Sequence, residues 1–165
     1  MTSNGANVAE TVRDAIYRSC LLLDDQKWGE WLEQCEDDFQ YAIKAYSPEI
    51  SYDMTYYSGS RDDLATMTGM LPKHNSEHSP FKRHATVYSV ELDEDGTTAT
   101  AVSSLVVYQN MLDGVNAHLD SGESQLFLIG KYLDTLKIEN GEAKFVAREV
   151  RLDTRRLDRG SHWPI

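Results

Sequence analysis

The feature that most constrains the fold is residues 121–153 (SGESQLFLIGKYLDTLKIENGEAKFVAREVRLD), in which two β-rich runs flank Asn140-Gly141. Asn-Gly is the strongest short-range signal for a type I′ hairpin turn, because both central residues of that turn take positive φ. A turn centred there predicts three apolar cross-strand pairs: Ile138 with Ala143, Leu136 with Phe145, and Ile129 with Leu152. Because apolar pairs fall on both faces, the hairpin needs further elements to cover it.

The upstream sequence supplies three candidate helices for that cover. Asn7 and Glu10 form a plausible capping pair, and apolar residues recur at helical spacing from Val8 to Leu23, so residues 1–7 are expected to be flexible. A second helical set comprises Trp28, Trp31, Leu32 and Cys35. A third helix is predicted from a Ser60/Asp63 cap, with Pro72 ending it.

Alternating apolar residues predict the strands. They indicate strands over residues 39–45, 50–56, 84–92 and 97–111, followed by the hairpin. The order is two helices, two strands, a helix and four long strands, without βαβ alternation. This order predicts one α+β domain over residues 1–165, with helices gathered on one face of a mostly antiparallel, strongly curved sheet.

Composition narrows the class of function. The 165 residues carry a formal charge of −11, which repels nucleic acids and anionic membranes. No apolar run is long enough to span a bilayer and the first residues do not resemble a secretory signal, so we expect a soluble cytoplasmic protein. Cys20 and Cys35 are expected to be buried, reduced thiols.

Two motifs resemble metal sites but lack the required context. His74-Asn-Ser-Glu77-His78 matches the H-x-x-E-H pattern of zinc peptidases, which requires a helix, whereas Pro72 and Pro80 oppose a helix here. Asp93-Glu94-Asp95-Gly96 lacks the downstream glutamate of a calcium loop and is typical of a hairpin turn. We therefore expect a polar loop, a turn and no metal site.

A curved sheet wrapped by helices can leave an open cone in which polar residues perform acid–base chemistry. The candidates are Tyr41, Asp53, Tyr56, His84 and Tyr88. They support the alternative hypothesis of a free-standing isomerase or dehydratase that uses Asp53 and His84 together with Tyr41 and Tyr56. A small-molecule binding module would use the same residues, whereas the structural interpretation is hydrogen-bonded tyrosines and one satisfied histidine.

Basic residues concentrate near the C-terminus of this acidic chain. The cluster contains Arg148, Arg151, Asp153, Arg155, Arg156, Asp158, Arg159 and Trp163. Arginine and tryptophan are enriched at protein interfaces, so residues 154–165 are a candidate interface tail, with a solvated tail as the alternative. One apolar face of the hairpin is expected to pack on the helices, and the other, with the arginines that follow it, is expected to be available to a partner subunit.

Several segments together resemble the small (β) subunits of Rieske non-haem iron ring-hydroxylating oxygenases. They are LLLDDQKWGEWLEQCEDDFQYAI, SGSRDDLATM with its helix-starting Arg61, SPFKRHATVYSVEL, SSLVVYQNM, GKYLDTL and VAREVRLDT. The resemblance runs from about Val12 to Asp153. It adds Arg61 to the candidate interface residues.

The resemblance implies a cone-shaped fold shared with nuclear transport factor 2, ketosteroid isomerase and scytalone dehydratase. It also implies an α3β3 hexamer whose large subunit carries the Rieske [2Fe-2S] cluster and the mononuclear Fe(II), and on which the reductase or ferredoxin acts. Two scattered cysteines cannot hold a Cys2His2 cluster, so no cofactor and no catalytic residue is expected on this chain. The substrate is left open between an aromatic acid, a salicylate-type compound, another aromatic compound and a small sulfonate.

Overall fold

A computed structural model describes residues 2–74, 79–111, 122–157 and 163–165. Side chains are described for these residues except 2–6 and 74. The elements follow the chain in the order α1 (Thr2–Asp24), α2 (Trp28–Glu33), β1 (Cys35–Ser47), β2 (Tyr52–Ser60), α3 (Arg61–His74), β3 (Phe81–Leu92), β4 (Thr98–Asn110), β5 (Ser124–Glu139) and β6 (Glu142–Leu152).

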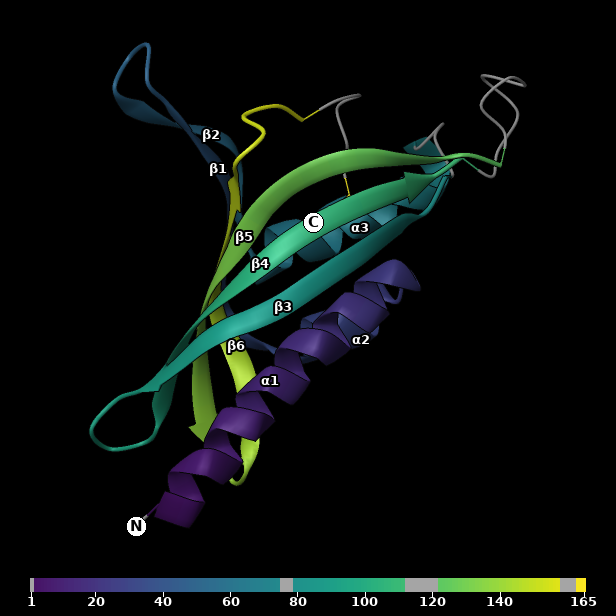
Figure 1. The fold of residues 1–165 in the computed structure, drawn as a ribbon. Helices are drawn as coiled ribbons and strands as arrows, with labels where there is room; N and C mark the ends of the chain where they lie inside the picture. Colours follow the sequence, from purple (N-terminus) through teal and green to yellow (C-terminus); the bar gives the residue numbers. More distant parts are fainter. Residues whose placement is uncertain (1, 75–78, 112–121, 158–162) are drawn as a thin grey trace.

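The six strands form one curved sheet in the order β2-β1-β6-β5-β4-β3 (Figure 1). Neighbouring strands are antiparallel except for the parallel pair β1 and β6. Helix α1 packs along β3 and α3 packs against β1 and β2, so the described helices share one side of the sheet. The predicted α+β architecture is confirmed. The sheet is an open cone because β2 and β3 stand at its two ends and do not pair with each other.

The predicted hairpin is β5–β6, and most of its register is confirmed. Asn140 and Gly141 have φ of 53° and 80°, as a type I′ turn requires. The pairs Ile138–Ala143 and Leu136–Phe145 form as predicted. A β-bulge between Thr135 and Leu136 then shifts the register by one, so that Gly130, not Ile129, faces Leu152.

The helix boundaries differ from the prediction at three points. Helix α1 begins at Thr2, so Asn7 lies inside the helix instead of capping it and residues 2–7 are helical. Helix α2 ends at Glu33, so Cys35 opens β1 instead of lying on a helical face. Pro72 lies inside α3 and does not end it.

The start of α3 is confirmed as a capping box. The Asp63 carboxylate accepts hydrogen bonds from the backbone N–H and the hydroxyl of Ser60, at 2.8 and 2.9 Å. The Asp63 backbone N–H donates in return to Ser60 Oγ at 3.2 Å. These bonds fix where α3 leaves β2 and therefore how its buried Leu64 meets the sheet.

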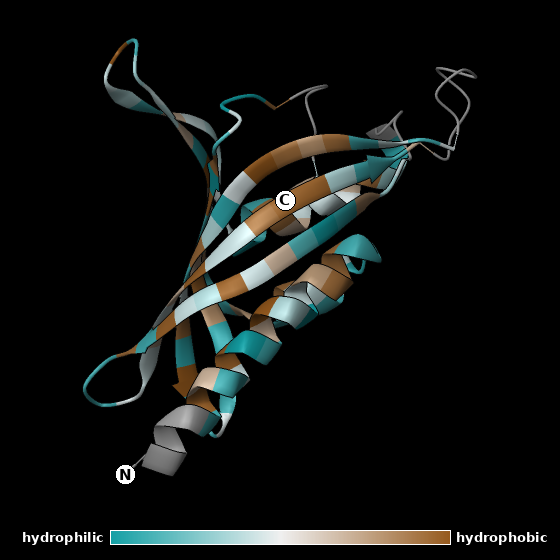
Figure 2. Ribbon diagram, viewed as in Figure 1, coloured by the Kyte–Doolittle hydropathy of each residue, from teal (hydrophilic) through white to brown (hydrophobic). Residues whose placement is uncertain are grey.

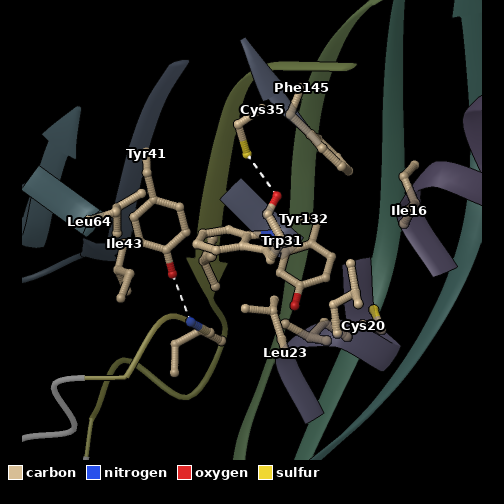
Figure 3. Close-up of a cluster of buried hydrophobic side chains, with 14 of the residues drawn as sticks. Ile16, Cys20, Leu23, Trp31, Cys35, Tyr41, Ile43, Leu64, Tyr132 and Phe145 are labelled. Atoms are coloured by element: carbon tan, nitrogen blue, oxygen red, sulfur yellow. Dashed lines mark hydrogen bonds between the residues drawn. The ribbon is translucent and has the colours of Figure 1, made fainter. Parts of the chain in front are cut away.

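The core lies between the sheet and the helices. Figure 2 shows apolar residues recurring at intervals along the strands, and in β1 the predicted alternating set is buried: Phe39, Tyr41, Ile43 and Ala45. Trp31 from α2 stands edge-on to both Phe39 and Tyr41, and Ile16 and Leu23 of α1 complete this cluster (Figure 3). Phe145 of β6 belongs to the same cluster, so the first and last strands of the chain share one core.

Both cysteines are free and buried, as predicted. Burial raises the pKa of the Cys20 thiol and raises that of Cys35 to about 12. Cys35 Sγ also donates a hydrogen bond to the carbonyl oxygen of Trp31 at 3.6 Å (Figure 3). The protonated thiol is therefore the stable form of both side chains at neutral pH.

Candidate functional site

The side of the sheet that faces away from the helices carries a patch of exposed apolar side chains. We call it the outer patch, and its members are Tyr88, Val102, Tyr108, Leu126 and Ile129, of which each is at least 36% exposed. They come from β3, β4 and β5, where Tyr108 pairs with Leu126 and Val106 with Ile129. Large exposed apolar groups on one face of neighbouring strands are a feature of protein interaction surfaces.

A shallow hollow of about 670 Å³ lies on the same side of the sheet, next to the outer patch. Its walls include short side chains from β1, β2, β4 and β6, such as Ala42, Ser58, Thr100 and Ala147. Because these side chains are small, the sheet is locally indented there. The hollow gives this face a concave region beside the outer patch.

An ionic network borders the hollow. Arg151 donates to Asp53 at 2.8 Å and to Glu149 at 3.2 Å, and Lys44 lies 3.5 Å from Glu149. Lys44 and Glu149 also line the hollow itself. Each side chain of this network is partly exposed, so the network stabilises the monomer only weakly and leaves charge available to a partner.

A second ionic contact ties the segment after β6 to the β1–β2 connection. Arg155 forms an ion pair with Glu49, and Tyr56 Oη donates to the Arg155 carbonyl oxygen at 2.6 Å. Hydrogen bonds to the backbone, to Ser47 and to Arg155 lower the pKa of Glu49 to about 2. Asp153 and Arg156 are also exposed in this region, whereas Asp158 and Arg159 of the predicted cluster lie outside the described residues.

Two predicted interface residues lie in the interior instead of on the surface. Arg148 is 1% exposed and donates to both carboxylate oxygens of Asp134, at 2.7 and 2.8 Å. Trp163 is 7% exposed and packs within this chain. Arg61 lies away from the ionic network, where it binds the Leu32 carbonyl oxygen and Asp37.

The buried ion pair is held in its charged state by mutual pairing. Burial alone would lower the pKa of Arg148, but the charge and hydrogen bonds of Asp134 raise it. Burial raises the pKa of Asp134, an effect that the Arg148 charge opposes. The two oxygens of the carboxylate are already occupied by the guanidinium, so this pair is a structural element of the core.

The structure does not bring the predicted acid–base set together. Tyr41 is buried, where its hydroxyl accepts a hydrogen bond from the Ile165 backbone N–H. Asp53 is paired with Arg151, Tyr56 is exposed, and His84 stands edge-on to Tyr108 on the outer face, with ring centroids 5.6 Å apart. Tyr41 therefore faces the core, whereas His84 faces the outer side of the sheet.

Two features explain why the predicted acid–base residues do not point inward together: β-bulges, and the choice of which alternate residues of a strand face the core. A bulge at Tyr56 lets Tyr57 pack against the core in its place, and another at Tyr88 interrupts the pairing of β3 with β4. In β3 the alternation was predicted correctly, but the buried phase is Phe81 and Arg83 instead of His84. Alternation of apolar and polar residues defines two sets of side chains on opposite faces of a strand, but it does not tell which set faces the core.

The two metal-like motifs are only partly covered by the structure. His74 ends α3, and residues 75–78 lie outside the described residues. Asp93 forms the predicted turn, because its carboxylate accepts from the Thr97 and Thr98 backbone N–H groups. Within the described parts of the chain, no group of three His, Cys, Asp or Glu side chains is placed to hold a metal ion.

Comparison with known proteins identifies the molecular context of this fold. A family model described as "Ring hydroxylating beta subunit" matches residues 18–159. The chain is 59% identical over 159 residues to the methanesulfonate monooxygenase hydroxylase subunit beta of Methylosulfonomonas methylovora, covering 96% of this chain and 88% of that protein. It is 30% identical over 157 residues to the 2-aminobenzenesulfonate 2,3-dioxygenase subunit beta of an Alcaligenes species, covering 94% and 97%.

A solved structure shows the same architecture. The beta subunit assigned to an aromatic-ring-hydroxylating dioxygenase of Novosphingobium aromaticivorans superimposes with a TM-score of 0.75 at 23% identity, covering 96% of this chain and 99% of that one. The fold is therefore the cone-shaped α+β fold that the resemblance implies. None of the described helices has the length and apolar character needed to cross a membrane.

Proposed function

This chain belongs to the ring-hydroxylating beta subunit family, and from that premise we propose that it is the structural small subunit of an α3β3 oxygenase. In this assembly the large subunit carries the Rieske [2Fe-2S] cluster and the mononuclear Fe(II), and receives electrons from a reductase or ferredoxin. The chain itself contributes contacts that hold the large subunits in place. It acts in the cytoplasm as part of that soluble enzyme.

The observation that carries this proposal is the outer patch beside the hollow and the ionic network. Leu126 and Ile129 are 52% and 39% exposed, although both lie in β5 and pair with residues of β4. Burying such side chains at an interface contributes about 25 cal/mol per Å² of apolar surface. Arg151, Asp153, Arg155 and Arg156 at the border supply the polar rim typical of an interface.

Co-purification tests this proposal. We expect Leu126→Glu, in a chain expressed with its large subunit, to abolish or strongly reduce co-elution, because a carboxylate would be buried against the partner. Leu21→Glu is the matched control, since Leu21 is 61% exposed on α1, on the helix side of the sheet. Equal co-elution of both variants, with both chains folded, would show that the outer patch is not the interface.

We further propose that the oxygenase acts on a sulfonate. Both relatives named above belong to enzymes whose names give a sulfonate substrate, and the one at 59% identity uses methanesulfonate. The test is oxygen consumption by the complete purified oxygenase with methanesulfonate, 2-aminobenzenesulfonate and benzoate. Turnover of benzoate alone would contradict the proposal.

A further inference from the structure

Residues 163–165 close one end of the cone on its helix side. They pack on four side chains that we call the cone mouth, Trp28, Tyr41, Phe81 and Arg83. Trp163 stands edge-on to Phe81 and Trp28, with ring centroids 5.1 and 6.1 Å apart. Trp163 and Ile165 are 7% and 0% exposed, so the segment is as buried as the core.

The cone mouth also binds the main chain of this segment. The Ile165 backbone N–H donates to Tyr41 Oη at 2.8 Å (Figure 3), and Arg83 Nη2 donates to the Pro164 carbonyl oxygen at 2.7 Å. Arg83 is held in position by Asp24, with Nη1 2.8 Å from Oδ1. An aromatic pocket with one acceptor and one donor for backbone groups has the chemistry of a peptide-binding site.

The segment bridges parts of the sheet that do not pair with one another. Tyr41 lies on β1 whereas Phe81 and Arg83 lie on β3, and three strands separate β1 from β3 in the sheet. Residues 163–165 belong to no helix or strand. The described contacts of the segment are side-chain packing and main-chain hydrogen bonds to Tyr41 and Arg83, and no strand ladder has to break for it to leave.

We propose that the cone mouth is a binding pocket for a short peptide with an aromatic residue, a proline and an apolar residue, and that residues 163–165 occupy it as a tethered ligand. The segment opens locally while the sheet stays folded, because segments outside the hydrogen-bonded elements open at lower free energy than the core. When it opens, an apolar pocket on the helix side becomes accessible. This pocket is separate from the outer patch.

Amide hydrogen exchange on the full-length chain tests local opening. The Ile165 amide should exchange at least 100-fold faster than the amides of Tyr132 and Leu136, which pair in the centre of the sheet. Tyr41→Phe removes the acceptor for the Ile165 N–H, so that amide should exchange roughly tenfold faster still, with the β5 amides unchanged. Tyr56→Phe is the control, because it removes a hydroxyl that binds Arg155 elsewhere.

The proposal would be overturned if the Ile165 amide exchanged at the same rate as the β5 amides in the unchanged chain, in Tyr41→Phe and in Tyr56→Phe. In that case the segment would leave only when the whole domain unfolds, and residues 163–165 would be ordinary core.

Peptide binding in trans is the second measurement. A chain shortened by residues 163–165 should remain folded and bind the peptide SHWPI (residues 161–165) saturably, with at least tenfold weaker binding of SHAPI. A shortened chain that does not fold, or that folds and binds both peptides equally, would overturn the proposal. Neither measurement involves the large subunit, so the outcome is independent of the proposed function.

Discussion

Arg148 shows how burial changes the role of a residue. In the sequence it belongs to an arginine-rich run, yet in the fold its guanidinium lies between the rings of Tyr132 and Phe145, 3.9 and 4.5 Å from their centroids. It also donates to Ser19 of α1 at 3.1 Å. With Asp134 on the neighbouring strand, these contacts satisfy the charge inside the core.

Removing one partner of this pair should be costly. We expect Asp134→Asn to lower the free energy of unfolding by about 3–5 kcal/mol, because Arg148 would keep its charge without a counter-ion. Urea denaturation followed by circular dichroism measures the change. The matched control is Asp53→Asn, which breaks the partly exposed pair with Arg151 and should cost about 1 kcal/mol or less.

Similar losses in the two variants would contradict this account of Arg148. A double variant, Asp134→Leu with Arg148→Met, should recover most of the loss, since well-packed apolar residues can replace a buried ion pair.

At the scale of elements, the β5–β6 hairpin depends on a close approach at Gly130. A Cβ added there would lie 2.2 Å from the Arg151 backbone oxygen. We expect Gly130→Ala to destabilise the fold by about 1–3 kcal/mol, because the two backbones must separate. Gly69→Ala is the control, since that exposed glycine in α3 has open space around its Cα and alanine is the better helix former.

The midpoint temperature of thermal unfolding should therefore be lower for Gly130→Ala than for the unchanged chain, and slightly higher for Gly69→Ala. Equal midpoints would mean that β5 and β6 are not in the described register.

The sequence predicts the elements better than their faces. Turn chemistry at Asn140-Gly141 and the Ser60/Asp63 cap are local signals, and both were confirmed. Bulges at Tyr56 and Tyr88 are not local signals, because they depend on the partner strand. The acid–base hypothesis required the side chains of Tyr56 and His84 to point into the cone. The structure does not support it, because neither side chain does so.

One face of the hairpin was predicted to be available to a partner subunit, but the individual residues of the outer patch were not predicted. Tyr108, Leu126 and Ile129 lie in strands that are apolar on both faces, and periodicity alone cannot distinguish a two-sided core from an exposed binding face. The sequence signal for the outer patch was the set of apolar cross-strand pairs expected on both faces of the hairpin. They indicated a second covered face, and the structure shows that in this chain no described element covers it.

At the scale of the whole molecule, one curved sheet serves two purposes. Its helix side, where α1 and α3 pack (Figure 1), holds the core and the cone mouth. Its outer side carries the patch, the hollow and the ionic network. The chain carries a net charge of −11, and a cluster of arginines borders the outer side. In the proposed function, this outer side is the face that another subunit of the oxygenase covers.

Hydroxyl-radical footprinting of the chain alone and in complex with its large subunit tests this central claim most directly. Oxidation of Tyr88, Tyr108 and Leu126 should fall at least severalfold on assembly, whereas oxidation of the exposed α1 residues Tyr17 and Leu21 should stay the same. Protection of Tyr17 and Leu21, with the outer patch still oxidised as in the free chain, would contradict the claim.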